Sequence, residues 1–371
     1  MKIILFVRSF FAGGAERVGL LLAPEIAKLG NEVIIAVAHN SGDFREQLPR
    51  AIKLIDLKCV KPIKGTYRLS KVIDSERPDA IIAFGMQAGI AASISQFIFR
   101  WKCPLLVSNQ NNMEAEWGNA DLLNKIIGPI LSRWVARRHK IACVSNALAK
   151  ATADYFKVDL GQIVTIRNPG STEGDLANPE DFLHPWLKEK SIPTLVAVGR
   201  LEYQKGFDTL IEALSIVRKT VSARLVIFGD GSLRENLERD VGAFGLSNVI
   251  DMPGFTRYPA LQMREASAFV LSSRFEGFPL VLIEALLNGT RVIATDCDFG
   301  PAEILENGRY GALCRVDDTN GLADAIIRLL SGGLDLEIPS PDWGRQFSAE
   351  TVAELHLNAI SELIRKLRLV L

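Results

Sequence analysis

The sequence predicts an α/β protein made of two doubly wound, Rossmann-like domains, each built on a parallel sheet. Short apolar runs alternate with amphipathic stretches of helical period along most of the chain, as in sheets covered by helices on both faces. At 371 residues the chain is also too long for one ordinary core. The alternation breaks once, over residues 170–193, which are rich in Gly, Asn, Pro, Asp and Glu and which we interpret as the interdomain connection.

In the first half, apolar runs bounded by turn residues predict the strands, and periodic stretches predict the helices between them. The expected strands cover residues 2–7, 32–38, 52–57, 80–84, 104–108 and 141–144, and the run 163–169 closes this half. A turn over residues 8–17 leads into a helix that reaches about Lys28, and further helices are expected at 67–75, 87–99 and 122–139, the last interrupted at Pro129.

The alternation restarts after the connection. The expected strands cover residues 194–198, 223–228, 249–252, 268–271, 291–295 and 311–314, and the expected helices cover 207–220, 232–244, 258–265, 280–287 and 321–330. The last stretch, residues 349–371, has the pattern of one amphipathic helix, which in a two-sheet protein can cross back onto the first domain.

Composition excludes several classes of protein. No apolar stretch approaches the roughly 20 residues that a membrane-spanning helix needs. The N-terminus has no cleavage site and reads as a buried strand, not as a signal peptide. The five cysteines are widely spread without a C-x-x-C pair, so neither a disulfide framework nor a zinc site is expected. We expect a cytoplasmic protein.

The two halves differ in charge although the net charge is zero. Residues 1–170 hold 23 Lys and Arg against 14 Asp and Glu (+9), which leaves 20 basic against 29 acidic residues (−9) for the remainder. The basic half is expected to meet an anionic surface. Anionic lipid headgroups on the cytoplasmic face of a membrane, or a phosphate-bearing acceptor, fit at least as well as nucleic acid, for which there is no motif. Charge complementarity between the domains is the alternative. The candidate contacts are the stretch 53–68 and a cluster that could equally be a solvated helix face: Arg133, Arg137, Arg138 and Lys140 beside Trp134.

Two glutamates frame the stretch 274–284. The Gly-Phe-Pro turn before an apolar run predicts a loop and then a helix, so Glu276 precedes the helix and Glu284 lies about one turn inside it. The amides of Gly277, Phe278 and Leu280 fall at the helix N-terminus, where unpaired N–H groups attract anions. Acids on both sides of an anion site suit a nucleotide sugar. The alternative is a solvated helix with two surface glutamates.

Other strand ends of the second half carry candidate ligands. Arg200 and Lys205 follow the strand 194–198, where ligands of parallel sheets bind, and together they can hold a diphosphate. A plain cationic surface loop is the alternative. Gly229 and Gly231 form another strand-to-helix turn, and Phe255 ends the next strand, where backbone groups can lie beside a base. A metal site at Asp296-Cys-Asp298 is not expected.

In the first half, Gly13 and Gly14 allow close approach of the backbone to a ligand before a helix with free amides. They form neither a G-x-G-x-x-G fingerprint nor a phosphate-binding loop with G-K-[ST], which puts an NAD-dependent oxidoreductase last among the alternatives.

Taken in order, these motifs resemble glycosyltransferase family 4 over nearly the whole chain. The motifs are Gly13-Gly14-Ala-Glu-Arg17, Gly199-Arg200 with Gln204-Lys205-Gly206, Gly229-x-Gly231, and Glu276-Gly-Phe-Pro with Glu284. The resemblance implies a retaining, nucleotide-sugar-dependent enzyme of GT-B fold, with two Rossmann-like domains facing across a cleft. It implies an acceptor-binding domain over 1–170, completed by the helix 349–371, and a donor-binding domain over 171–348.

The resemblance also implies roles for single residues. Arg200 and Lys205 would hold the donor diphosphate, Glu276 would bind the donor sugar, and Glu284 would bind the ribose hydroxyls. Further donor contacts are implied for Gly13, Gly14, Gly229, Gly231, Phe255, Gly277, Phe278, Pro279 and Leu280. No metal or other cofactor is expected.

One departure concerns a histidine that many family members carry after an N-terminal-domain strand. The corresponding stretch here, residues 107–112, has none, and we interpret His39 as a loop residue. Asn109 and Gln110 are the candidates for contact with the sugar or acceptor.

The prediction is therefore a retaining glycosyltransferase, with UDP favoured over GDP in the donor. The acceptor would be a glycan or lipid-linked molecule of cell-surface polysaccharide or glycolipid synthesis. The alternatives are a GT-B sugar-nucleotide epimerase and a non-catalytic nucleotide-sugar-binding partner protein.

Overall fold

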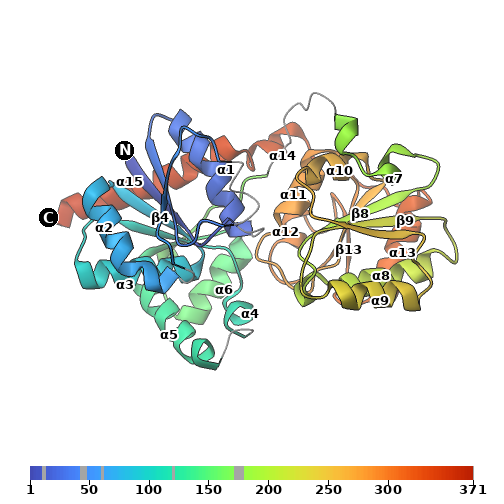
Figure 1. Ribbon diagram of the computed structural model, residues 1–371, viewed down its shortest axis with the longest axis horizontal. Coiled ribbons are helices and arrows are strands. Elements are labelled where there is room, and N and C mark those ends of the chain that lie inside the picture. Colours follow the sequence, from blue (N-terminus) through green and yellow to red (C-terminus); the bar gives the residue numbers. More distant parts are fainter. Residues whose placement is uncertain (11–13, 42–47, 60–61, 119–121, 171–178, 371) are drawn as a thin grey trace. The chain divides into compact units, whose positions relative to one another are not determined.

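The computed structural model describes residues 1–371 except 11–13, 42–47, 60–61, 119–121, 171–178 and 371 (Figure 1). The chain forms two compact units. The first unit comprises Met1–Pro169 and Arg345–Leu371, and the second comprises Gly170–Gly344. Each unit has its own parallel sheet, which confirms the predicted fold class.

The first unit is built on seven parallel strands in the order β3-β2-β1-β4-β5-β6-β7. Its central strands are buried except at Lys2, and they are apolar except for Lys2 at the start of β1 and Ser108 and Asn109 at the end of β5, because helices cover both faces of the sheet. The strands are β1 (Lys2–Val7), β2 (Glu32–Val37), β3 (Lys53–Asp56), β4 (Ala80–Phe84), β5 (Leu105–Asn109), β6 (Lys140–Cys143) and β7 (Ile163–Thr165). The helices are α1 (Gly14–Lys28), α2 (Thr66–Glu76), α3 (Met86–Phe99), α4 (Met113–Gly118), α5 (Leu122–Arg138), α6 (Asn146–Phe156) and α15 (Ala349–Val370), with short turns η2 (Pro62–Gly65) and η3 (Leu160–Gln162).

The last helix, α15, packs on α1 and so belongs to the first unit, as predicted. Val352, Ala353 and Ile360 of α15 are fully buried. The ring of His356 lies 6.1 Å from that of Phe84 at the end of β4. The helix therefore completes the hydrophobic core of the unit.

The second unit has six parallel strands in the order β10-β9-β8-β11-β12-β13. The strands are β8 (Thr194–Val198), β9 (Arg224–Phe228), β10 (Ile250–Gly254), β11 (Ala268–Leu271), β12 (Val292–Thr295) and β13 (Ala312–Cys314). The helices are α7 (Pro185–Lys188), α8 (Phe207–Val217), α9 (Arg234–Ala243), α10 (Pro259–Glu265), α11 (Leu280–Leu287), α12 (Pro301–Ile304), α13 (Thr319–Leu330) and α14 (Pro341–Arg345), with turns η4 (Pro179–Phe182) and η5 (Tyr203–Lys205).

The order of the strands sets where ligands can bind. In the second unit the chain moves outward from β8 in one direction through β9 and β10, and then in the other direction through β11, β12 and β13. The direction reverses between β8 and β11, and in parallel sheets ligands bind beside the loops that leave two such strands at their carboxyl ends. The same reversal lies between β1 and β4 in the first unit.

The predicted interruption at Pro129 is wrong, because α5 runs through this residue. A proline in a helix removes the N–H that would bond the carbonyl four residues earlier, here that of Lys125. Residues 122–127 are exposed, so water can hydrate this carbonyl and the helix continues.

Several helices were not predicted from the sequence: α4, α6, α7, α12 and α14. For α6 a signal was present, since Ser145 caps the helix by accepting a hydrogen bond from the amide of Leu148 at 3.0 Å. No helix in the described ranges combines the length and the apolar character needed to cross a bilayer.

Candidate functional site

Two loops meet at the carboxyl ends of β8 and β11, where the strand order of the second unit reverses. The strands are parallel neighbours, with Leu195 opposite Ala268. One loop runs from Gly199 through η5 to Gly206, and the other from Ser272 to Pro279, directly before α11. The predicted cations Arg200 and Lys205 therefore lie on one loop and Glu276 on the other.

The structure joins Lys205 to Glu276 directly. The Nζ atom of Lys205 lies 2.6 Å from Oε1 of Glu276, and the side chains are only 15% and 8% exposed. The hydroxyl of Ser273 donates to the same oxygen at 2.7 Å. Oε2 of Glu276 makes no hydrogen bond within the described residues, so it can accept one from a ligand hydroxyl.

Hydrogen bonds from side chains to backbone carbonyls join the two loops. The amide nitrogen of the Gln204 side chain donates to the carbonyl of Phe275 at 2.9 Å, and the hydroxyl of Ser272 donates to the carbonyl of Lys205 at 2.8 Å. Gly206 has φ +59° and packs against the Ser272 carbonyl so closely that a Cβ would collide with it. The ion pair therefore rests on a fixed backbone.

Arg274 also joins the two loops, by donating to the carbonyl of Tyr203 at 2.8 Å. Its guanidinium bonds Asp208 at 2.7 Å and Asp317 at 2.8 Å, and it lies 4.2 Å from the ring centroid of Tyr203. Since two carboxylates already neutralise this cation, it is a structural residue and not an anion ligand. The sequence offers no signal for this, because both acids are distant along the chain.

Arg200, unlike Arg274, is not neutralised by neighbouring carboxylates in the described part of the chain. It is exposed, and its guanidinium makes one long contact of 3.5 Å, to Oε1 of Gln204. It forms no ion pair with an acid of the described residues. An exposed cation with so few contacts, on the same loop as Lys205, can engage an anionic ligand at little cost in lost contacts.

The two glutamates of the stretch 274–284 are buried, Glu276 at 7% exposure and Glu284 at 0%. This excludes a solvated helix with surface glutamates. Glu284 is the fifth residue of α11, as predicted, and Pro279 stands at the N-cap position. A buried carboxylate within a turn of a helix N-terminus is typical of a binding site and is not expected of a surface helix.

Gly229 and Gly231 follow β9 and pack against the first of the two loops. Gly229 has φ 142°, and a Cβ at this position would collide with the carbonyl of Gly199. A Cβ on Gly231 would also lie too close to the carbonyl oxygen of Leu201, at 2.5 Å. These glycines are required by loop packing, whatever they contribute to a ligand. Phe255, after β10, is 48% exposed.

Cys297 lies beside the ion pair and was not predicted. Burial raises the pKa of this thiol to about 12, and the negative charge of Glu276 adds to the rise. The thiol therefore stays protonated near Glu276 at neutral pH and is not a nucleophile.

The predicted contacts of the first unit lie at the end of β5. Asn109 donates to the hydroxyl of Thr152 at 3.1 Å, and Gln110 donates to the hydroxyl of Ser108 at 2.7 Å. Oδ1 of Asn109 and Oε1 of Gln110 are buried and accept no hydrogen bond from the described residues. Buried acceptors of this kind are stabilised by a donor from a ligand or water.

Gly14 is the first residue of α1, and Gly13 lies outside the described residues. Their role toward a donor stays a prediction, as do the roles of Gly277, Phe278, Pro279 and Leu280 in the first turn of α11 and the segment before it.

The histidines are engaged in structural contacts or lie in loops. His139 bonds Ser93 at 2.8 Å, and burial lowers its pKa to about 4. His356 donates from Nδ1 to the carbonyl of Val352 at 2.8 Å, and its pKa is also lowered to about 4 by burial. His184 caps α7 and bonds Asp251, while His39 is half-buried after β2. No group of three metal-ligating side chains occurs among the described residues.

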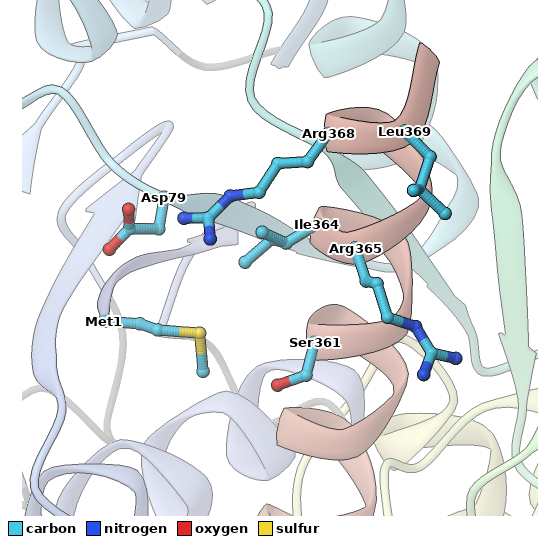
Figure 2. Close-up of a pocket in the computed structure, with 7 residues that line it drawn as sticks. All are labelled: Met1, Asp79, Ser361, Ile364, Arg365, Arg368 and Leu369. Carbon is cyan, nitrogen blue, oxygen red and sulfur yellow. The ribbon is translucent and has the colours of Figure 1, made fainter. Parts of the chain in front are cut away.

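A cavity of about 380 Å³ lies elsewhere, in the first unit (Figure 2). Met1 and Asp79 border it from the amino ends of β1 and β4, and the last turns of α15 supply Ser361, Ile364, Arg365, Arg368 and Leu369. It is at the opposite end of these strands from their carboxyl edge. None of the predicted site residues lines it.

Comparisons with known proteins agree with this geometry. A family model described as "Glycosyltransferase Family 4" matches residues 12–173, and one described as "Glycosyl transferases group 1" matches residues 192–332. An N-acetylgalactosaminyltransferase of Campylobacter jejuni, named for an N-acetylgalactosamine-N,N'-diacetylbacillosaminyl-diphospho-undecaprenol substrate, is 33% identical over 89% of this chain and 90% of its own. The lipopolysaccharide 1,6-galactosyltransferase of Escherichia coli is 30% identical over 76% of this chain and 74% of its own.

Among solved structures, HepE of Anabaena in complex with UDP and glucose superposes with a TM-score of 0.79 at 19% identity, over 97% of this chain and 99% of that chain. Sucrose-phosphate synthase of Thermosynechococcus elongatus gives a TM-score of 0.78 at 18% identity, over 98% and 99% of the two chains. At these identities the likeness concerns the fold.

Proposed function

Because the chain belongs to the family 4, group 1 glycosyltransferases and has their GT-B fold, we propose that it is a retaining enzyme that uses a UDP-sugar. The proposed acceptor is a lipid-linked glycan of polysaccharide, lipopolysaccharide or glycolipid synthesis. Two relatives support this choice, since one is named for a diphospho-undecaprenol substrate and the other for lipopolysaccharide. UDP is favoured over GDP because a structural neighbour was solved with UDP and glucose.

The observation that carries the proposal is the Lys205–Glu276 ion pair at the carboxyl ends of β8 and β11. In this pair, a cation that can bind the diphosphate is in direct contact with a carboxylate that can bind the sugar hydroxyls. A donor binds with its diphosphate against Lys205 and Arg200, so that Lys205 exchanges one anionic partner for another. Glu276 then accepts hydrogen bonds from the sugar, and the Ser273 hydroxyl keeps its carboxylate oriented.

Negative charge grows on the diphosphate as the bond from the sugar C1 to oxygen breaks. Lys205, Arg200 and the amides before α11 stabilise this charge, and removing one such preorganised group lowers kcat by about 10²–10³-fold. Retention follows when the acceptor hydroxyl attacks from the face that the diphosphate leaves, with a leaving-group oxygen taking the proton. With two cations serving the diphosphate, the proposed reaction needs no metal ion.

The nucleoside and the transferred sugar have separate partners. Glu284 binds the ribose hydroxyls, and Phe255 and the turn at Gly229 and Gly231 border the base and phosphates. Asn109 and Gln110 replace the histidine of many family members and accept hydrogen bonds from the sugar or the acceptor through their buried oxygens.

The test is turnover by the purified protein of a panel of UDP- and GDP-sugars, with and without an undecaprenyl diphosphate-linked glycan. Released nucleotide is measured, and the anomeric configuration of the product is read by NMR. The proposal expects acceptor-dependent release of UDP and a product with the anomeric configuration of the donor. An inverted product refutes retention, and release from GDP-sugars alone refutes the donor assignment.

Two variants make the test specific to the site. Lys205→Met should lower kcat by about 10²–10³-fold. Lys219→Met, which changes an exposed lysine after α8, is the matched control and should turn over like the wild type. Donor binding without transfer to any acceptor would instead favour a partner protein, and interconversion of donors would favour an epimerase.

A further inference from the structure

The loop that leaves β12, residues 296–300, has the sequence Asp-Cys-Asp-Phe-Gly, and the proposed reaction assigns it no role. β12 is the parallel neighbour of β11, with Val292 opposite Phe269, so this loop leaves the sheet at the same edge as the loop that carries Glu276. The helices that follow the two loops, α12 and α11, lie side by side (Figure 1). The loop 296–300 therefore borders the candidate site.

Two contacts join this loop directly to the loop of Glu276. The amide of Glu276 donates a long hydrogen bond of 3.4 Å to the carbonyl of Asp298. Gly300 packs so closely on Pro279 that a Cβ at Gly300 would lie 2.6 Å from the proline Cδ atom. The two loops therefore pack against each other next to Glu276.

The two aspartates of the loop are exposed and have no counter-ion. Neither Asp296 nor Asp298 forms an ion pair with a cation of the described residues, and no group of three metal-ligating side chains occurs there. The thiol of Cys297 lies between them in sequence, and its pKa is raised to about 12 by burial and also by the negative charge of Glu276. Glu276 is therefore close enough to this loop to act on it electrostatically.

The backbone of the loop is strained at Phe299, which has φ 62°. A bulky residue rarely adopts this left-handed conformation, and such outliers gather at ligand sites. The Phe299 side chain is half-buried, and the residues before and after it, Asp298 and Gly300, are those that contact the loop of Glu276. Phe299 is thus held near Glu276 in spite of an unfavourable backbone conformation.

The charges of the site are unequally distributed once a donor is bound. In the proposed complex Arg200 and Lys205 hold the diphosphate, so they no longer balance the three acids on the sugar side, which are Glu276, Asp296 and Asp298. A carboxylate on the sugar would be repelled by each acid, which weakens its binding about twofold for charges about 8 Å apart near a protein surface at physiological salt. Three acids together weaken binding of an anionic sugar by about tenfold.

We propose that the loop 296–300 selects the donor sugar: it accepts an uncharged sugar, packed on the Phe299 ring, and rejects a sugar that bears a carboxylate. The C–H groups of a sugar ring form an apolar face that suits an aromatic side chain, and its hydroxyls can donate to the acids. The inference rests on the proposed function, since it names the class of sugar that the same site takes.

The experiment is calorimetric titration of the full chain with UDP and with two matched pairs of donors, UDP-glucose with UDP-glucuronate and UDP-galactose with UDP-galacturonate. The members of a pair differ only at C6, which is a hydroxymethyl group in one and a carboxylate in the other. The neutral donor of each pair should bind about tenfold more tightly. The difference should shrink in 500 mM salt, which shortens the Debye length to about 4 Å.

Two outcomes of this titration are decisive. A uronate that binds as tightly as its neutral partner overturns the proposed selection, while the proposed function stands. Failure of UDP itself to bind overturns the proposed function and the selection with it.

The role of the aspartates is tested by Asp296→Asn/Asp298→Asn. This variant should reduce the difference within each pair of donors about fourfold, because two of the three repelling charges are removed. Asp240→Asn/Asp335→Asn, which removes one acid from α9 and one after α13, is the matched control and should keep the wild-type difference. Wild-type selectivity in the Asp296→Asn/Asp298→Asn variant overturns the proposal.

The role of the ring is tested by Phe299→Ala. This variant should bind the more tightly bound neutral donor about tenfold more weakly and should bind UDP, which has no sugar beyond the diphosphate, like the wild type. Phe244→Ala, which changes an exposed phenylalanine of the same unit, is the control. A purely structural role of Phe299 would weaken UDP and the UDP-sugar equally or change neither, and either result overturns the contact with the sugar.

Discussion

Replacing Lys205 with methionine removes one partner of an almost buried ion pair and leaves the charge of Glu276 uncompensated. The side chains are 15% and 8% exposed, and the N–O distance is 2.6 Å. Stranding one charge of a buried pair destabilises a protein by about 3–5 kcal/mol. Because the pair lies at a loop surface that water can reach in part, we expect the lower end, about 3 kcal/mol for Lys205→Met.

The neighbouring variants sharpen this expectation. Glu276→Gln keeps an oxygen that can accept from Ser273 and should cost less, about 1–2 kcal/mol. The double variant Lys205→Met/Glu276→Gln contains no stranded charge and should lie within about 1 kcal/mol of the wild type. The two single changes are therefore expected to be strongly non-additive, with a coupling energy of about 3–5 kcal/mol.

The assay is urea unfolding of the four proteins, followed by a signal of the second unit, together with thermal scans. For a unit of this size, 3 kcal/mol lowers the transition temperature by roughly 6–12 °C. Two results would refute the reasoning: single variants within about 0.5 kcal/mol of the wild type, or a double variant whose destabilisation equals the sum of the single ones. Either result would mean that the Lys205–Glu276 contact makes no net contribution to the free energy of unfolding.

Three further outcomes are expected. Glu284→Ala should weaken UDP binding about 10–100-fold in calorimetry, since a hydrogen bond to a charged group contributes about 1.5–3 kcal/mol; unchanged affinity would contradict the ribose assignment. Gly229→Ala should destabilise the second unit by more than about 2 kcal/mol in urea unfolding, because its Cβ meets the Gly199 carbonyl, whereas Gly242→Ala, which meets nothing within 4 Å, is the control. His356 is neutral when folded because burial lowers its pKa to about 4. Its contribution is complete above the unfolded pKa of about 6.5 and is lost as pH falls toward 4, so the first unit should lose about 2 kcal/mol between pH 7.5 and pH 5. His356→Leu should remove this loss, and an unaltered pH dependence would contradict it.

The sequence predicted helix and strand bounds best where burial produces a recognisable pattern of apolar residues along the chain. Strands such as β8 and β11 are continuous apolar runs because helices cover both of their faces, and their bounds agree with the predicted ones. Glu284 could be placed one turn into its helix because the Gly-Phe-Pro turn marks the helix start. These features depend on neighbours along the chain.

Contacts between residues that are far apart along the chain could not be predicted from the sequence. Lys205 and Glu276 are 71 residues apart, and their contact depends on β8 and β11 being adjacent in the sheet, which the alternation of strands and helices does not determine. For the same reason the neutralisation of Arg274 by Asp208 and Asp317 could not be foreseen. The helix α6 was not predicted despite its Ser145 cap, because its alanine-rich sequence has few of the large apolar residues that mark the other helices.

The placement of α15 in the first unit has a consequence for synthesis of the chain. Residues of the second unit, Gly170–Gly344, are made after most of the first unit but before α15. At a rate of about 5–20 residues per second, the ribosome needs roughly 10–35 s to make them. Throughout that interval the α1 surface that α15 covers stays open, and the second unit has its whole sequence before α15 is made. Co-translational folding of this protein should therefore finish in the order second unit, then first, and chaperones that bind exposed apolar surface have their longest opportunity at α1.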